Sequence, residues 1–111
     1  IGPGGGWCPQ ADRLHLFGDE TALPAMARML DLARGEVTAH VRAGYPDLGP
    51  LAADPRVTRC DDLLAALASA DPGQGDFVWF AAEAGQARHA RQHLLARGMA
   101  RKAFTTAAYW G

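Results

Sequence analysis

The sequence has little of what stabilises secreted domains or anchors proteins in membranes. Its 111 residues include two cysteines, Cys8 and Cys60, in no Cys-x-x-Cys motif, so we expect unlinked thiols rather than a disulfide framework. No apolar run approaches the roughly 20 residues that cross a bilayer, and we expect no membrane insertion. The start lacks the charged and apolar regions of a signal peptide, so we expect a cytoplasmic protein. Because the chain begins at Ile1 rather than Met, we expect it to be a piece of a longer polypeptide.

Several catalytic motifs are also missing. The chain contains no Gly-x-Ser-x-Gly, no His-Glu-x-x-His and no P-loop, which argues against a serine hydrolase, a zinc protease of that type and a P-loop nucleotidase. His89 and His93 lie four residues apart on a predicted helix, but with no third ligand nearby we expect no metal site. We also find no acid–base pair or activated nucleophile, and we therefore expect no catalytic side chain.

The composition is that of one ordinary globular domain, with 49% hydrophobic and 21% charged residues and a net charge of −1. We expect no nucleic-acid partner. The charge is unevenly distributed, because all 12 acidic residues lie at or before Glu83. Residues 84–111 carry five basic residues: Arg88, Arg91, Arg97, Arg101 and Lys102. This basic stretch is either a solvated helix surface or a rim that attracts anions.

Strands and helices are expected to alternate along the chain. Apolar runs and β-branched residues predict strands at 13–17, 37–41, 57–60, 77–81 and 103–106. Helical periodicity predicts helices at 22–33, after a cap at Asp61 or Asp62, and at 85–97. Prolines at 46, 50 and 55 predict an irregular loop over 45–55. The alternation indicates an α/β fold, a three-layer sandwich with a parallel sheet between helices.

The segment from Gly18 to Pro24 is expected to turn a buried strand sharply into a helix. Thr21 is a candidate cap for that helix, and Pro24 is tolerated in its first turn. In open α/β sheets this first strand-to-helix turn is where ligands bind, because the helix N-terminus offers free N–H groups and a partial positive charge. An ordinary connection with a good cap is the simpler interpretation of the same residues.

Three motifs resemble those of the siderophore-interacting proteins, flavin-dependent ferric-siderophore reductases similar in fold to the ferredoxin reductases. Gly18-Asp19-Glu20-Thr21-Ala22-Leu23-Pro24-Ala25 resembles the loop of that family without a mismatch. Trp79-Phe80-Ala81-Ala82-Glu83-Ala84 resembles its Trp-x-Ala-Gly-Glu-Ala segment, with Ala82 where glycine is usual, and Thr106-Ala107-Ala108-Tyr109-Trp110 resembles its Thr-Gly-Tyr-Trp ending. Upstream, Gly2-Pro3-Gly4-Gly5 resembles the Gly-Pro-x-Gly that closes the flavin-binding barrel of the family.

The resemblance implies that residues 13–111 are the C-terminal NAD(P)H-binding domain of such a reductase. Residues 1–12 would be a linker or the end of an FAD-binding barrel that this sequence does not include. The five parallel strands would take the order 3-2-1-4-5, with the strand at Leu14 to Phe17 in the middle. A hydride would pass from NAD(P)H to FAD, and single electrons from FAD to the Fe(III) of a siderophore. The partners implied are therefore an FAD-binding barrel domain and a ferric siderophore as substrate.

Ten residues are candidates for cofactor binding: Gly18, Asp19, Glu20, Thr21, Ala22, Arg42, Glu83, Ala84, Tyr109 and Trp110. Backbone N–H groups of the Gly18 loop and the Thr21 hydroxyl would bind the pyrophosphate, whereas the loop carboxylates would repel it and so cap the helix or contact ribose hydroxyls. Arg42 ends the second strand, where an arginine favours the 2′-phosphate of NADP, although an exposed ion-paired arginine is an equal alternative.

The other end of the candidate site is aromatic. The resemblance puts Glu83 and its neighbour Ala84 close to the nicotinamide. Tyr109 and Trp110 suit stacking on a flavin or nicotinamide; alternatively, they fill the core of the domain. We expect part of their surface to be exposed in the absence of a barrel domain. A non-catalytic module that binds a nucleotide or a partner with the same fold is the alternative to a reductase domain.

Overall fold

A parallel β-sheet forms the middle of the molecule in the computed structural model, which describes residues 8–111. Its strand order is β3-β2-β1-β4-β5, and every pairing is parallel. The strands are β1 (Arg13–Asp19), β2 (Glu36–Arg42), β3 (Val57–Arg59), β4 (Asp76–Glu83) and β5 (Phe104–Trp110). This confirms the predicted five-stranded sheet and its order. The Gly2–Gly5 motif lies outside the described residues.

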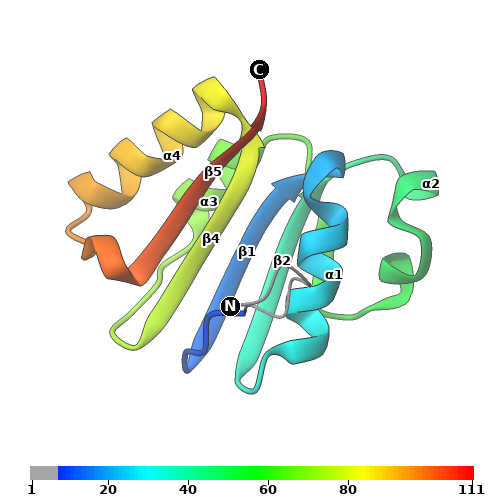
Figure 1. Cartoon of the computed structure of the whole chain (residues 1–111), viewed down its shortest axis with the longest axis horizontal. Coiled ribbons are helices and arrows are strands. Elements are labelled where there is room, and N and C mark those ends of the chain that lie inside the picture. The colour runs from blue at the N-terminus through cyan, green and yellow to red at the C-terminus, as the bar shows by residue number, and fades with distance from the viewer. Residues whose placement is uncertain (1–7) are drawn as a thin grey trace.

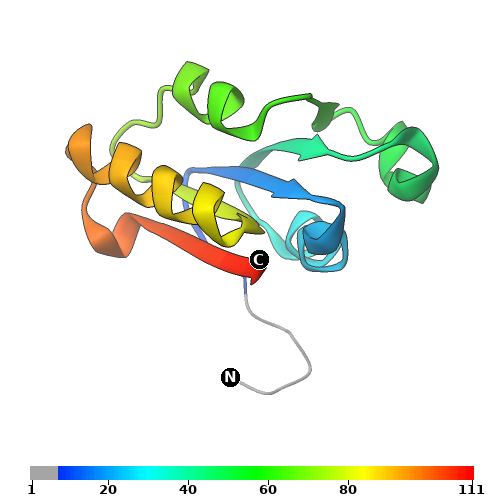
Figure 2. The same ribbon diagram turned by 90° about the horizontal axis from the view of Figure 1, so that it is seen from above.

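Helices cover both faces of the sheet (Figure 2). The α-helices are α1 (Leu23–Leu32), α2 (Tyr45–Leu48), α3 (Leu63–Ser69) and α4 (Ala84–Ala96). Short 3-10 turns are η1 (Glu20–Ala22), η2 (Gly49–Ala53) and η3 (Arg101–Ala103). Helix α1 packs on one face, and α3 and α4 pack on the other, which gives the predicted three layers. No helix within residues 8–111 is long and apolar enough to cross a membrane.

Alternating side chains of β1 supply two separate cores. Leu14 and Leu16 pack with Met26 of α1, whereas Phe17 packs with Leu63 of α3 and Phe80 of β4 on the opposite face. Strand β4 is buried on both faces from Val78 to Ala82, as its continuous apolar sequence predicts. Burying each large apolar side chain stabilises the fold by roughly 1.5–3 kcal/mol. The two cores therefore fix β1 and β4 as the rigid centre of the sheet.

The prediction of an irregular loop over 45–55 is wrong, because α2 and η2 occupy residues 45–53. Pro46 and Pro50 each lie in the first turn of their helix, where a backbone N–H has no intrahelical partner in any case. Proline therefore starts two short turns here rather than preventing them.

The prediction that Thr21 caps the first helix is wrong, whereas one of the two loop carboxylates considered for that role caps the turn that precedes the helix. Asp19, not Thr21, caps the turn after β1, because the Asp19 carboxylate accepts the Thr21 N–H. The turn is a 3-10 turn, and α1 itself begins at Leu23 without a side-chain cap. Of the two acids before α3, Asp62 is the cap and accepts the Ala65 N–H at 3.0 Å.

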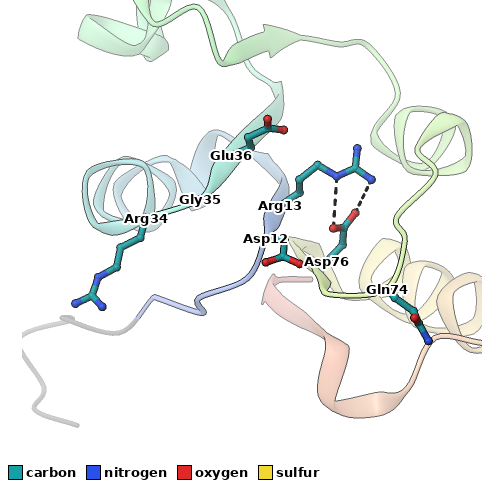
Figure 3. A pocket seen from close by; sticks show the side chains of 7 residues that line it. All are labelled: Asp12, Arg13, Arg34, Gly35, Glu36, Gln74 and Asp76. Atoms are coloured by element: carbon teal, nitrogen blue, oxygen red, sulfur yellow. Dashed lines mark hydrogen bonds and ion pairs between the residues drawn. The ribbon is translucent and has the colours of Figure 1, made fainter.

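A buried carboxylate joins β1 to β4 at the amino ends of the strands. Asp76 accepts hydrogen bonds from Arg13 Nη2 at 2.9 Å and from the Gly73 N–H at 3.0 Å, and its Oδ2 lies 3.0 Å from His15 Nε2. Arg13 and Asp76 line a cleft of about 660 Å³ at this edge (Figure 3). Burial of Asp76 raises its pKa, but the hydrogen bonds from Gly73, His15 and Arg13 outweigh this effect and leave the pKa below its usual range. The ion pair of Arg13 and Asp76 is thus committed to holding β1 and β4 together.

We expect the Asp76→Asn variant to lose about 1–3 kcal/mol of unfolding free energy at neutral pH, because asparagine brings one acceptor oxygen to a site with several donors. A carboxyl with a lowered pKa in the folded chain contributes stability above its unfolded pKa and loses it as pH falls through the folded value. In urea unfolding measured across the acidic range, the difference in unfolding free energy between parent and variant should therefore decrease below about pH 4.

Asp12→Asn is the matched control, since Asp12 lines the same cleft but is exposed. We expect this control to leave stability nearly unchanged. The role given to Asp76 would be contradicted if Asp76→Asn did not lower the unfolding free energy at neutral pH. It would also be contradicted if the difference from the parent stayed constant as the pH falls.

Candidate functional site

The carboxyl ends of all five strands meet at one edge of the sheet, and the C-terminus lies at that edge (Figure 1). In open α/β sheets this is the edge where ligands bind. Gly18 and Asp19 end β1, Arg42 ends β2, Glu83 ends β4 and Trp110 ends β5. The fold thus brings the predicted site residues to one edge of the molecule, although they are distributed over most of the sequence.

Asp19 lies at the centre of this edge and is 2% exposed. One of its oxygens accepts both the N–H and the hydroxyl of Thr21, and the other accepts the indole Nε1–H of Trp110 at 2.7 Å. A buried carboxylate is stable only when such donors compensate for the water it has lost. The Asp19–Trp110 bond therefore fixes the end of β5 to the loop after β1, although β4 lies between the two strands.

Gly18 and Ala22 shape this loop from inside. A Cβ atom at Gly18 would lie 2.7 Å from Met26 Sδ and 2.8 Å from the Cβ of Ala22, so only glycine lets α1 approach β1 so closely. Ala22 is fully buried in the same core. Neither residue presents a side chain to a ligand, and their effect on nucleotide binding would come through the backbone.

Glu20 and Thr21 are the exposed residues of the loop. The two Thr21 donors predicted to bind a pyrophosphate already bind Asp19. A phosphate contact from the Thr21 hydroxyl would therefore require that hydroxyl to exchange partners. The predicted phosphate role of Thr21 stays a prediction.

Glu83 caps helix α4 at the end of β4. Its Oε1 accepts the Gln86 N–H at 3.1 Å, and the backbone N–H groups of Gly85 and Gln86 lower the pKa of this carboxyl. The helix consequently begins at Ala84, one residue before the predicted start. Ala84 lies against Gly111, where a Cβ would come within 3.0 Å of the Ala84 methyl. The proximity of Glu83 and Ala84 to a nicotinamide stays a prediction.

Two aromatic side chains at the end of β5 are half exposed, Tyr109 at 43% and Trp110 at 50%. Tyr109 meets the buried Trp79 edge to face, with ring centroids 6.1 Å apart. The rings are thus anchored to the domain on one side and open on the other. This confirms that part of their surface is exposed, as expected, and argues against the alternative that Tyr109 and Trp110 only fill the core of the domain.

A cleft of about 420 Å³ lies at the carboxyl ends of the first three strands. It is lined by Glu20, Arg42, Ala43, Gly44, Arg59, Cys60 and Asp61. Arg42 forms no ion pair within residues 8–111 and donates instead to the Asp61 carbonyl at 3.2 Å, so the ion-paired alternative for this residue does not hold there. Sequence reasoning missed Arg59, although its place near the end of the third predicted strand is a usable signal.

The basic residues after Glu83 do not form a rim around this edge. Helix α4 runs away from it, so Arg88 lies within about one turn of Glu83, whereas Arg101 and Lys102 lie in η3 before β5 begins. Lys102 lines a different cleft with Gly73 and Asp76, at the amino edge. Arg97 forms an ion pair with Asp71 at 2.9 Å. The hypothesis of a single anion-attracting rim is therefore not supported by the placement of these charges.

We expect a double-mutant cycle between Asp19 and Trp110 to give a coupling free energy of about 1 kcal/mol in urea unfolding. Asp19→Asn leaves a donor of Thr21 or Trp110 without an acceptor, and Trp110→Phe removes one of those donors. Asp19→Asn should therefore lower the unfolding free energy by less in the Trp110→Phe variant than in the parent. Asp61→Asn combined with Trp110→Phe is the control and should show no coupling. Additive effects at Asp19 and Trp110 would mean that the bond does not form in solution.

Comparison with known proteins agrees with this fold. A family model described as siderophore-interacting protein matches residues 11–111. No curated protein gives a significant match. The solved structure of the siderophore-interacting protein from Acinetobacter baumannii is similar, with a TM-score of 0.77 and 19% identity over 90% of this chain and 46% of that one. A siderophore utilization protein from T. fusca has a TM-score of 0.73 and 30% identity over 94% of this chain and 46% of that one.

The chain thus spans less than half the length of both solved structures. The family model, in contrast, covers nearly all of the chain, including the Gly18 loop and the aromatic end. On this match, the chain belongs to the siderophore-interacting protein family.

Proposed function

We propose that this chain is the NAD(P)H-binding domain of a flavin-dependent reductase that releases iron from ferric siderophores. One observation carries the proposal: a cleft with two arginines that form no ion pair within residues 8–111 and a half-exposed aromatic pair share the carboxyl edge of one parallel sheet. The family match supports the siderophore part of the proposal. The length of the solved relatives supports a second domain, which we propose to be an FAD-binding barrel.

The residues at the cleft fit a dinucleotide. The guanidinium groups of Arg42 and Arg59 offer charge-assisted donors for phosphate, and the exposed Glu20 carboxylate offers an acceptor for ribose hydroxyls. The cleft volume of about 420 Å³ is within the usual range for small-molecule sites. These side chains would hold the adenosine half of the cofactor.

The aromatic end fits a flat ring. Tyr109 and Trp110 expose about half of their surface, and apolar planes with polar atoms at their rims suit contact with a flavin or nicotinamide. With both cofactors bound, NAD(P)H would supply a hydride to FAD, and the reduced flavin would supply single electrons to the Fe(III) of the siderophore. The protein groups bind, orient and exclude water, which agrees with the lack of a recognisable catalytic side chain in the sequence.

Asp19 links the two ends of this site. Its bonds to Thr21 and Trp110 hold the loop after β1 and the end of β5 in one arrangement. A nucleotide held at the first three strands would therefore meet the aromatic rings at a constant distance. We place the reaction in the cytoplasm, where NAD(P)H is the available reductant.

We expect the 111-residue chain alone to bind NAD(P)H weakly and to reduce no ferric siderophore, because we propose that the hydride acceptor, FAD, is held by a separate barrel domain. Fused behind an FAD-binding barrel, the same chain should support NAD(P)H-dependent release of Fe(II), measured with a colorimetric Fe(II) chelator. The fusion without the siderophore and the barrel without the chain are the controls.

Robust reductase activity from the chain without flavin would contradict the proposal. A fusion that binds both NAD(P)H and FAD yet releases no Fe(II) would favour the alternative, a non-catalytic module that binds a nucleotide or a partner.

A further inference from the structure

Two arginines are pinned across neighbouring strands at the carboxyl edge. Arg42 of β2 donates from Nε to the carbonyl of Asp61, just beyond β3, at 3.2 Å. Arg59 of β3 donates from Nε to the carbonyl of Ala43, just beyond β2, at 2.8 Å. Each guanidinium is thus held through its Nε by a backbone carbonyl just beyond the neighbouring strand. Both arginines line the same cleft.

The terminal nitrogens of these two arginines have no carboxylate partner among residues 8–111. By contrast, Arg13, Arg56 and Arg97 are each paired with an aspartate. Glu20 and Asp61 line the cleft as well, yet neither forms an ion pair with Arg42 or Arg59. The cleft therefore holds two oriented guanidiniums whose charge is not neutralised by a direct partner.

Tyr45 restricts Arg59 further. The guanidinium carbon of Arg59 lies 4.3 Å from the centroid of the Tyr45 ring, a cation–π contact. The ring is 66% exposed, so its position is not explained by core packing. A guanidinium held by a carbonyl on one side and a ring on another loses little further freedom when it binds an anion.

The end of the second strand is where dinucleotide-binding α/β folds distinguish the two nicotinamide cofactors. A carboxylate there binds the 2′-hydroxyl of NAD, and an arginine accommodates the 2′-phosphate of NADP. No acid occurs between Glu36 and Asp47 in this chain, and Arg42 ends β2. Glu20 is the nearby carboxylate, but it lies after β1.

We propose that Arg42 and Arg59 together bind the 2′-phosphate of NADPH, and that the chain selects NADPH over NADH. The inference rests on the proposed function, because it assigns one cofactor to the proposed nucleotide site. Planar guanidiniums bind phosphate oxygens in a bidentate manner, so lysine would replace the charge but not the geometry.

The test is calorimetric titration of the 111-residue chain with NADPH, NADH, 2′,5′-ADP and 5′-AMP. We expect NADPH and 2′,5′-ADP to bind about 10-fold or more tightly than their counterparts without the 2′-phosphate, with the difference decreasing at high salt. Arg42→Gln and Arg59→Gln should each remove most of that difference, because they should weaken the binding of NADPH and 2′,5′-ADP much more than the binding of NADH and 5′-AMP. Arg42→Lys and Arg59→Lys should restore only part of it.

Arg91→Gln is the matched control, because it removes the same charge from the exposed surface of α4. It should leave the preference intact. Circular dichroism of each variant checks that the fold is retained, and the lysine variants provide a second comparison at each position.

The outcomes separate this inference from the proposed function. The proposed role of Arg42 and Arg59 would be overturned if the chain bound NADPH and NADH equally well, or if both glutamine variants kept the preference for NADPH. The proposal that the chain binds a nicotinamide nucleotide would still stand. If the chain binds neither nucleotide, both the proposed function and this inference are overturned.

Discussion

The carboxylate of Asp19 is buried at the edge of the sheet where the functional groups gather, and a charge in that position must be compensated by donors. Thr21 supplies two donors from the adjacent turn, and Trp110 supplies a third from a residue 91 positions later in the chain. The requirement to satisfy this one carboxylate thus sets both the 3-10 turn before α1 and the position of the last residues of β5. The loop and the aromatic end behave as one structural unit as a result.

The two edges of the sheet use charge in different ways. At the amino edge, Asp76 holds Arg13 and lies within hydrogen-bond distance of His15, so the charges there neutralise each other and stabilise the fold. At the carboxyl edge, Arg42 and Arg59 are held by backbone carbonyls and have no ion-pair partner among the described residues. The amino-edge cleft is larger, but its buried carboxylate, Asp76, is already paired with Arg13. The smaller carboxyl-edge cleft instead holds two arginines with no such partner among residues 8–111, which favours it as a site for an anionic ligand.

The sequence was informative wherever the structure depends on local patterns. The continuous apolar run from Phe77 to Ala81 predicted a strand that is buried on both faces, as β4 is from Val78 to Ala82. The alternation of elements predicted the parallel sheet. The bond between Asp19 and Trp110 could not be predicted, because nothing local in the sequence relates residues so far apart. The short turns at Pro46 and Pro50 were missed because proline is equally compatible with an irregular loop and with a first helical turn. Arg59 was missed for a different reason, since its importance depends on the neighbouring end of β2.

Every role proposed for this chain requires a nicotinamide nucleotide to bind at the carboxyl edge of its sheet. Titration of the isotope-labelled chain with NADPH, followed by backbone amide shifts in NMR spectra, tests it most directly. We expect shifts that cluster at Gly18–Ala22, at Arg42–Tyr45 and Arg59–Asp61, and at Tyr109–Gly111. Shifts that cluster instead around Asp12, Gly35 and Asp76 at the amino edge, or no shifts at saturating NADPH, would contradict it.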